Sequence, residues 1–190
     1  MGRPCEDMKE VSVQVADFDV GAEIAALSAA DPMAGAVASF VGLVRADKLA
    51  DPKVGVTEGN PLFGTGGTQC PAAGTAQPDR AAAVTAMTLE HYPGMTEEAL
   101  ADIVATAQKR WELRAVRVIH RVGRLLPGER IVFVGVASAH RGDAFAACEF
   151  IMDYLKTQAP FWKKEESPKG ERWVDARVTD DHAAKRWQPD

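Results

Sequence analysis

Two apolar segments close together in the sequence, 116–122 and 131–137, constrain the fold of this chain most strongly. In the first, valine recurs at every second position except for His120, and the second is almost continuously apolar. Both patterns are typical of β-strands. The connection contains Leu126-Pro127-Gly128-Glu129, a turn sequence with Gly128 at the expected left-handed position. The two segments are therefore predicted to form an antiparallel hairpin.

Three main helices, and a short polar helix at 180–187, are predicted outside this hairpin. The first is capped by Asp17 or Asp19 and ends near Ala30, the second is capped by Thr96, and the third covers about 143–157. The buried stripe of the third helix is predicted to comprise Phe145, Cys148, Met152 and Leu155. Further strands are predicted at 11–15, 36–44, 84–92, 161–166 and 172–174. Because there is no sustained βαβ run, the predicted fold class is α+β.

The segment from Ala50 to Arg80 has a different composition from the rest of the chain. Its 31 residues include six glycines and four prolines, and no helical or strand period runs through it. Loops of this length are uncommon inside compact domains. The segment is therefore predicted to be a flexible loop or an insertion.

Composition excludes several classes of protein. The net charge of −5 argues against a nucleic-acid binder, which would usually carry a basic face. No apolar run approaches the roughly 18 residues that span a membrane, and the first ten residues do not resemble a signal peptide. Cys5, Cys70 and Cys148 form no Cys-x-x-Cys pair, which argues against a disulfide framework and suits the cytoplasm.

The histidines do not indicate a metal site. His91, His120, His140 and His182 lack the spacings of common metal-binding motifs. His120 lies on an apolar strand face and is predicted to be a satisfied core or interface group. Cys148 lies on a helix stripe and is predicted to pack without a chemical role.

The segment Ser138-Ala139-His140-Arg141-Gly142-Asp143 is a candidate anion site. It joins an apolar strand to a helix, and a helix start presents free backbone N–H groups. His140 and Arg141 would add a titratable donor and a bidentate fork. The alternative is that Arg141 only solvates the turn and Asp143 only caps the helix.

A second group of basic residues surrounds Pro160. Lys156 ends the third predicted helix, and Lys163 and Lys164 follow the proline. Lys156 and Lys163 converge only if the chain folds back at Pro160, and the alternative is that each lysine complements a helix dipole or a solvated surface. Arg45 ends a buried strand, where its charge can point into a cleft.

Three longer segments carry a specific signature. They are Leu89-Glu90-His91-Tyr92-Pro93-Gly94-Met95-Thr96, Val132-Phe133-Val134-Gly135-Val136 with Ser138-Ala139-His140-Arg141, and Ile151-Met152-Asp153-Tyr154-Leu155-Lys156 with Ala159-Pro160-Phe161-Trp162-Lys163. In this order they closely resemble the catalytic (large) subunit family of molybdopterin synthase. The resemblance runs from about 11 to 187, implying one domain with an insertion at about 50–80 and tails at 1–10 and 188–190.

The resemblance implies an α/β hammerhead fold with a small antiparallel β-subdomain. It implies a homodimer within a two-plus-two heterotetramer, whose other subunit is a small ubiquitin-like sulfur carrier ending in a Gly-Gly thiocarboxylate. Two sulfur atoms would pass to cyclic pyranopterin monophosphate (precursor Z) and form the dithiolene of molybdopterin. The carrier brings the sulfur, so no catalytic cysteine, metal or other cofactor is expected in this cytoplasmic reaction.

The family's pocket residues map onto both basic groups of this sequence. Lys156 and Lys163 would be catalytic, and His140 and Arg141 resemble residues that reach the pocket of the neighbouring protomer. The implied substrate-binding set is Arg45, His140, Arg141, Lys156 and Lys163, with Lys164 and Glu165 flanking. The chain departs from the family in the 50–80 insertion and at Leu43, where some members carry a substrate-binding lysine.

Two other functions remain open from the sequence. One is a non-catalytic anion-binding scaffold of the same fold, although the matching His140, Arg141, Lys156 and Lys163 weigh against it. The other is a nucleic-acid-binding module that uses the basic run from Lys156 to Arg172. The net charge of −5 and the interleaved glutamates make the second function the weaker one.

Overall fold

The computed structural model describes residues 9–46, 83–174 and 184–187. The insertion expected at about 50–80 and the tail expected at 188–190 lie outside these ranges, and of the tail expected at 1–10 only residues 9 and 10 are described. Of the polar helix predicted near the C-terminus, only residues 184–187 are described, and 184–185 are helical.

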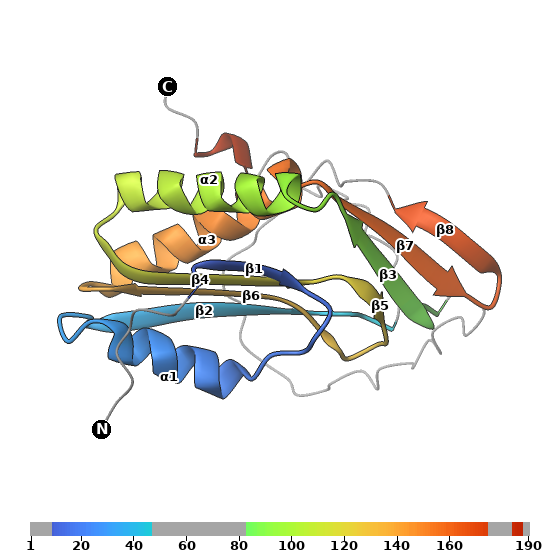
Figure 1. Cartoon of the computed structure of the whole chain (residues 1–190), viewed down its shortest axis with the longest axis horizontal. Coiled ribbons are helices and arrows are strands. Elements are labelled where there is room, and N and C mark those ends of the chain that lie inside the picture. Colours follow the sequence, from blue (N-terminus) through green and yellow to red (C-terminus); the bar gives the residue numbers. More distant parts are fainter. Residues whose placement is uncertain (1–8, 47–82, 175–183, 188–190) are drawn as a thin grey trace, which may run out of the picture.

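The described elements are eight strands and three helices, with runs of two or three strands between successive helices (Figure 1). In chain order they are β1 (Val11–Gln14), α1 (Val20–Ala30), β2 (Ala36–Leu43), β3 (Ala86–His91), α2 (Met95–Arg110), β4 (Leu113–Arg121), β5 (Gly123–Leu125), β6 (Arg130–Ser138), α3 (Arg141–Gln158), β7 (Phe161–Ser167) and β8 (Gly170–Val174).

The strands form two four-stranded sheets. The first sheet has the order β1-β4-β6-β2 and the second sheet has the order β5-β3-β7-β8. Among the described strands, only β1 and β4 pair in parallel, and the hairpin predicted from the sequence is the antiparallel pair β4–β6. The second sheet is antiparallel throughout, which agrees with the expected small β-subdomain. The α+β class is therefore confirmed.

Helices cover both faces of the first sheet. Apolar residues of α2 and α3 pack with Val116, Val118 and Val134 on one face. On the other face, Leu27 of α1 packs with Phe133 and other apolar side chains. Figure 1 shows α1 on the side of the first sheet opposite α2 and α3. The main core therefore lies between the first sheet and α2–α3.

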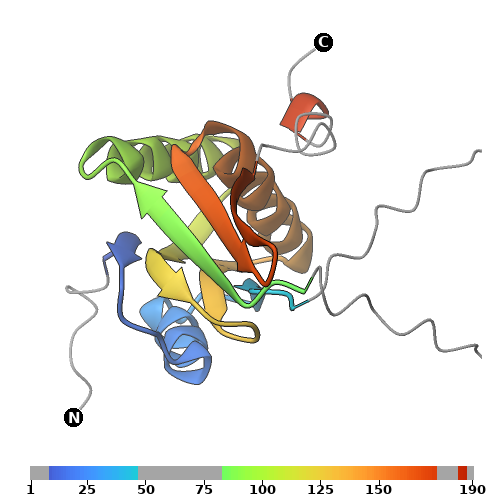
Figure 2. The same ribbon diagram turned by 90° about the vertical axis from the view of Figure 1, so that its right-hand side faces the viewer.

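The two sheets are joined where β2 and β4 end. Val44, just after β2, is buried with Leu89 of β3 and Leu125 of β5. The predicted turn holds Val44 in place, since the Gly128 amide donates to the Val44 carbonyl at 2.8 Å. Gly128 has a φ of 86°, so its predicted left-handed conformation is confirmed. Figure 2 shows β3 and β7 side by side on this side of the molecule.

Two details predicted from the sequence are wrong. Thr96 does not cap α2: the cap is Gly94, two residues earlier, whose φ of 86° is unfavourable for other residues. Thr96 is instead fully buried, and its hydroxyl donates to the Pro160 carbonyl at 3.2 Å. Phe145 is 66% exposed rather than part of the buried stripe of α3, because it faces away from the sheet that buries Cys148. At α1, Asp19 rather than Asp17 is the cap.

Candidate active site

α3 places basic side chains at both of its ends. His140 is the residue that precedes the helix, Arg141 is its first residue, and Lys156 lies in its last turn. All three are exposed. An α-helix rises about 1.5 Å per residue, so Arg141 and Lys156 are separated by about 22 Å along the axis. One chain therefore does not bring the two predicted groups of basic residues together.

The start of α3 is the position of the anion site that the sequence predicted. His140 is the N-cap and its side chain makes no capping hydrogen bond, so it does not occupy the N–H groups of the first turn. Asp143 lies inside the first turn, and the alternative that it caps the helix is wrong. The positive end of the helix dipole, His140 and Arg141 are thus gathered on one exposed surface.

A short turn at Pro160 connects the helix that carries Lys156 to the strand that carries Lys163. α3 ends at Gln158 and β7 begins at Phe161, so only two residues separate the elements. The buried Thr96 hydroxyl holds the Pro160 carbonyl, and it also accepts from the Tyr92 amide at 3.2 Å. The start of α2 therefore fixes the turn between the two lysines.

β7 divides the predicted residues between its two faces. Side chains alternate along a strand, so Phe161, Lys163 and Glu165 share one face and Lys164 lies on the other. Lys163 pairs across the sheet with Leu89, which is buried against the junction of the two sheets. Lys163 and Glu165 are both half-buried on this inner face.

Lys164 makes different contacts on the outer face. Its ammonium lies 2.9 Å from a Glu171 carboxylate oxygen and 5.9 Å from the centre of the Trp173 ring. Glu171 raises the pKa of Lys164 by accepting a hydrogen bond from it. The structure therefore does not bring Lys164 together with Lys163.

Arg45 is exposed at the junction of the two sheets. It follows Val44, which packs against Leu89, the cross-strand neighbour of Lys163. The next carbonyl, of Ala46, accepts a hydrogen bond from the Val84 amide at 2.7 Å. The structure thus places Arg45 beside the strand that pairs with β7. Leu43, where some relatives are expected to carry a lysine, is 52% exposed.

His120 lies beneath the start of β7. Its side chain is buried on β4, as predicted, and its ring stacks on Phe161 with 3.7 Å between ring centres. Burial, together with the smaller effects of the Lys163 and His91 charges, lowers its pKa to about 3. The sequence did not indicate the contact with Phe161, because the two residues are 41 positions apart and lie in different sheets.

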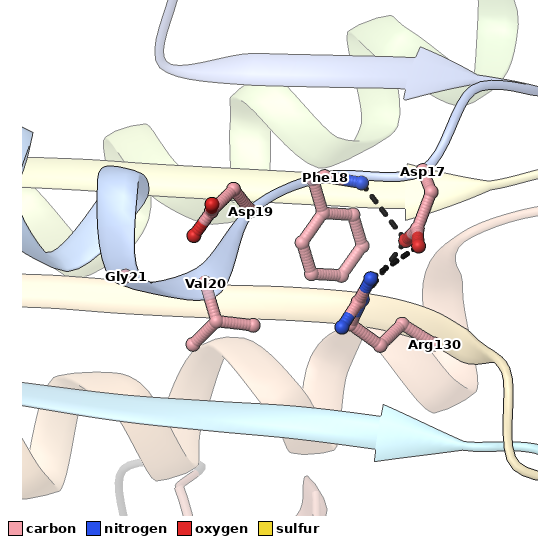
Figure 3. Close-up of a pocket in the computed structure, with 6 residues that line it drawn as sticks. All are labelled: Asp17, Phe18, Asp19, Val20, Gly21 and Arg130. Atoms are coloured by element: carbon pink, nitrogen blue, oxygen red, sulfur yellow. Dashed lines mark hydrogen bonds and ion pairs between the residues drawn. The ribbon is translucent and has the colours of Figure 1, made fainter.

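A shallow depression elsewhere does not match the predicted chemistry. It lies at the start of α1 and is lined by residues 17–21 and Arg130 (Figure 3). Asp17 binds Arg130, which lowers the pKa of the Asp17 carboxyl to about 2. Because Asp17 and Asp19 both lie at its rim, this depression is not suited to a phosphate or a thiocarboxylate.

The described residues also bear on the cysteine and metal predictions. Cys148 is buried, and burial raises the pKa of its thiol to about 11, so the thiolate that a nucleophile needs is disfavoured. Within 9–46, 83–174 and 184–187, no three His, Cys, Asp or Glu side chains are grouped to hold a metal ion. No helix in the same ranges is long and apolar enough to cross a membrane.

Comparison with known proteins gives one family. Residues 65–158 match the family described as MoaE protein. The molybdopterin synthase catalytic subunit of Ralstonia nicotianae is 53% identical over 180 residues, which cover 95% of this chain and 85% of the relative. The Escherichia coli protein of the same description is 50% identical over 170 residues, covering 90% of this chain and 92% of the relative.

Solved structures agree with this sequence relationship. The molybdopterin biosynthesis MoaE protein from Burkholderia ambifaria is 50% identical and has a TM-score of 0.67, with 95% of this chain and 98% of that chain covered. A protein–protein complex of subunits 1 and 2 of molybdopterin-converting factor from Helicobacter pylori contains a chain with a TM-score of 0.61. That chain is 15% identical, with 89% of this chain and 92% of that chain covered, so it supports the fold alone.

One assignment follows from three observations: the basic residues at both ends of α3, the two-sheet α+β fold and about 50% identity over most of the chain. The chain belongs to the molybdopterin synthase catalytic subunit (MoaE) family, the sulfurtransferases of molybdenum cofactor biosynthesis.

Proposed function

We propose that this chain transfers two sulfur atoms to cyclic pyranopterin monophosphate and so forms the dithiolene of molybdopterin. The sulfur comes from the thiocarboxylated C-terminus of a small ubiquitin-like carrier. Because the carrier supplies the sulfur, the proposal requires no catalytic cysteine, metal or other resident cofactor in this chain. The reaction is proposed to take place in the cytoplasm.

The charges of the site support this substrate class. The cyclic phosphate and the thiocarboxylate are both anionic, whereas the chain as a whole has a net charge of −5. Arg45, His140, Arg141, Lys156 and Lys163 would nevertheless present basic groups to the substrate. Such local concentrations of charge attract and orient anions.

The observation that carries the proposal is the distance between the basic residues at the two ends of α3. Arg141 and Lys156 are about 22 Å apart along the helix, too far for one substrate phosphate to contact both. A pocket that contains both groups therefore needs two copies of the chain. We propose that Lys156, Lys163 and Arg45 of one protomer face His140 and Arg141 of the other in a homodimer.

Each residue then has a defined task in the proposed pocket. The Lys156 and Lys163 ammonium groups donate protons to the substrate oxygen that sulfur replaces. They also stabilise the negative charge that develops on this oxygen as it leaves. Arg45, His140 and Arg141 bind the phosphate and the thiocarboxylate. Glu165, on the same face of β7 as Lys163, flanks the pocket and helps to orient that lysine. Lys164 flanks it from the outer face and contributes least.

The assembly is proposed to be a two-plus-two heterotetramer. The Helicobacter pylori structure is described as a complex of two molybdopterin-converting factor subunits, and one of them shares the fold of this chain. We propose an equivalent complex here, in which a carrier binds each catalytic protomer and inserts its C-terminal Gly-Gly tail into the shared pocket. Native mass spectrometry of the chain with a candidate carrier tests this stoichiometry.

Incubation with thiocarboxylated carrier and cyclic pyranopterin monophosphate tests the activity. Wild-type protein is expected to give the dithiolene product, detected by mass spectrometry, whereas a non-catalytic scaffold would give none. Lys163→Ala and Lys164→Ala form a matched pair, since they remove adjacent ammonium groups from opposite faces of β7. The first should lower the rate by ~10²-fold and the second much less. Equal effects would contradict the proposed pocket.

A further inference from the structure

The two sheets meet in a contact between two aromatic rings. His120 lies near the end of β4 in the first sheet, and Phe161 is the first residue of β7 in the second sheet. Their ring centres are 3.7 Å apart and their planes are inclined by 18°. His120 is only 3% exposed, so the contact is buried.

The orientation of the imidazole is fixed by a hydrogen bond. Its Nδ1 atom lies 2.9 Å from the Arg121 carbonyl oxygen. A carbonyl can only accept, so Nδ1 carries the proton and Nε2 does not. The ring is neutral near pH 7, because burial lowers its pKa to about 3. The protein thus holds a flat, uncharged ring in one orientation.

The ring of Phe161 in turn fixes the start of β7. Phe161 lies two residues before Lys163, and both side chains are on the inner face of the strand. On its other side, Phe161 follows Pro160, whose carbonyl accepts from the buried Thr96 hydroxyl. The Lys163 ammonium is near enough to His120 to lower the histidine pKa. His120 therefore lies close to the proposed catalytic lysine without carrying a competing charge.

We infer that His120 is a positioning residue, whose ring holds Phe161 and thereby aims the Lys163 ammonium into the pocket. The inference rests on the proposed catalytic role of Lys163. His120 itself does not need to touch the substrate. The hydrogen bond to the Arg121 carbonyl explains why an imidazole serves better here than a purely apolar ring: it prevents rotation of the ring plane.

Two substitutions distinguish the effect of the aromatic stack from the effect of the imidazole hydrogen bond. His120→Ala removes the stack, so β7 loses its support beneath Phe161. His120→Phe keeps an aromatic ring against Phe161 and loses only the hydrogen bond. Because small displacements of a catalytic group strongly slow reactions, His120→Ala should lower kcat about tenfold or more with an almost unchanged KM for the carrier. His120→Phe should retain kcat within about threefold of wild type.

Val118→Ala is the matched control. Val118 is buried on the same face of β4, two residues before His120, and packs in the main core rather than against Phe161. It should lower the melting temperature while leaving kcat per folded molecule within about twofold of wild type, because cavity formation affects stability. If Val118→Ala lowers kcat as much as His120→Ala, His120 is only a packing residue and the inference is wrong.

Lys163→Ala, assayed in parallel, distinguishes this inference from the proposed function. An inactive Lys163→Ala together with a normal kcat in His120→Ala would overturn the positioning role and leave the proposed function intact. A fully active Lys163→Ala would overturn the proposed function itself. If His120→Ala does not fold, Phe161→Leu removes the other ring of the stack. The same tenfold loss of kcat is then expected, and a normal kcat would contradict the inference.

Discussion

The hydroxyl of Thr96 donates to the Pro160 carbonyl at 3.2 Å and joins the start of α2 to the turn between α3 and β7. The same oxygen accepts from the Tyr92 amide. One fully buried side chain thus connects three segments of the chain. This turn carries Lys156 on one side and Lys163 on the other, so the core contact bears directly on the proposed site.

Thr96→Val should therefore destabilise the protein without changing its shape. Valine keeps the branched volume and removes the hydroxyl that serves Tyr92 and Pro160. Unpaired buried polar groups cost about 1–3 kcal/mol, and this loss should appear in urea unfolding. Thr96→Ser keeps the hydroxyl and should cost less. Equal stability of Thr96→Val and wild type would show that the two hydrogen bonds contribute little.

Lys156→Ala should lower sulfur transfer by ~10²-fold or more, the usual effect of removing a positioned acid–base or electrostatic group. Lys109→Ala is the control, because Lys109 lies in the last turn of α2 as Lys156 does in α3. Both variants lose a lysine that complements a helix dipole and should lose similar stability. Steady-state turnover with saturating carrier measures the difference. Near-wild-type turnover of Lys156→Ala would remove this lysine from the mechanism.

The buried His120 should make stability depend on pH. Its pKa is lowered to about 3 in the folded protein, whereas the unfolded chain binds this proton near pH 6.5. The part of the free energy of unfolding that depends on an uncharged His120 is fully present above pH 6.5. It is lost as the pH falls from about 6.5 toward 3, by at most about 1.4 kcal/mol per pH unit.

His120→Phe should flatten this dependence, because phenylalanine binds no proton. The free energy of unfolding of both proteins, measured between pH 5 and 6.5, gives the comparison. This range lies above the ordinary pKa of carboxyl groups, so acid-sensitive ion pairs such as Asp17–Arg130 contribute little there. Identical slopes in the two proteins would show that the imidazole is not held neutral by burial.

Residues 50–80 should be replaceable by a short Gly-Ser linker. The chain on either side is already joined, since the Val84 amide donates to the Ala46 carbonyl at 2.7 Å. Loop-closure entropy changes by only about 0.6 kcal/mol per doubling of length, so the melting temperature should stay within a few degrees. A raised KM would mean that the segment contributes to substrate binding. A variant that does not fold would show that the segment is part of the core.

Local pattern was sufficient to predict much of the fold. The alternation around His120 and the Gly128 turn predicted the β4–β6 hairpin, and the capping aspartate predicted α1. The short strand β5 was not predicted, because three residues carry no period and Gly123–Leu125 is recruited by β3 of the other sheet. The parallel pairing of β1 with β4 depends on tertiary contacts that local pattern does not record.

The candidate site was predicted less completely. The junction at His140 and the lysines around Pro160 were both found from residue type and position. Thr96 was interpreted as a helix cap because threonine commonly caps helices, but its hydroxyl is used by Pro160, 64 residues away. Adjacent lysines gave no indication that Lys163 and Lys164 differ. The alternation of β7 and the pairing of Lys164 with Glu171 separate them.

Mixing two inactive variants tests the shared pocket most directly. Arg141→Ala and Lys156→Ala chains are each expected to be nearly inactive as homodimers. After subunit exchange, a mixed dimer would combine the intact Lys156 of one chain with the intact Arg141 of the other in one of its two pockets. An equal mixture should then recover about a quarter of wild-type sulfur transfer, since half of its dimers are mixed. No recovery, with exchange demonstrated by native mass spectrometry, would contradict a pocket shared between protomers.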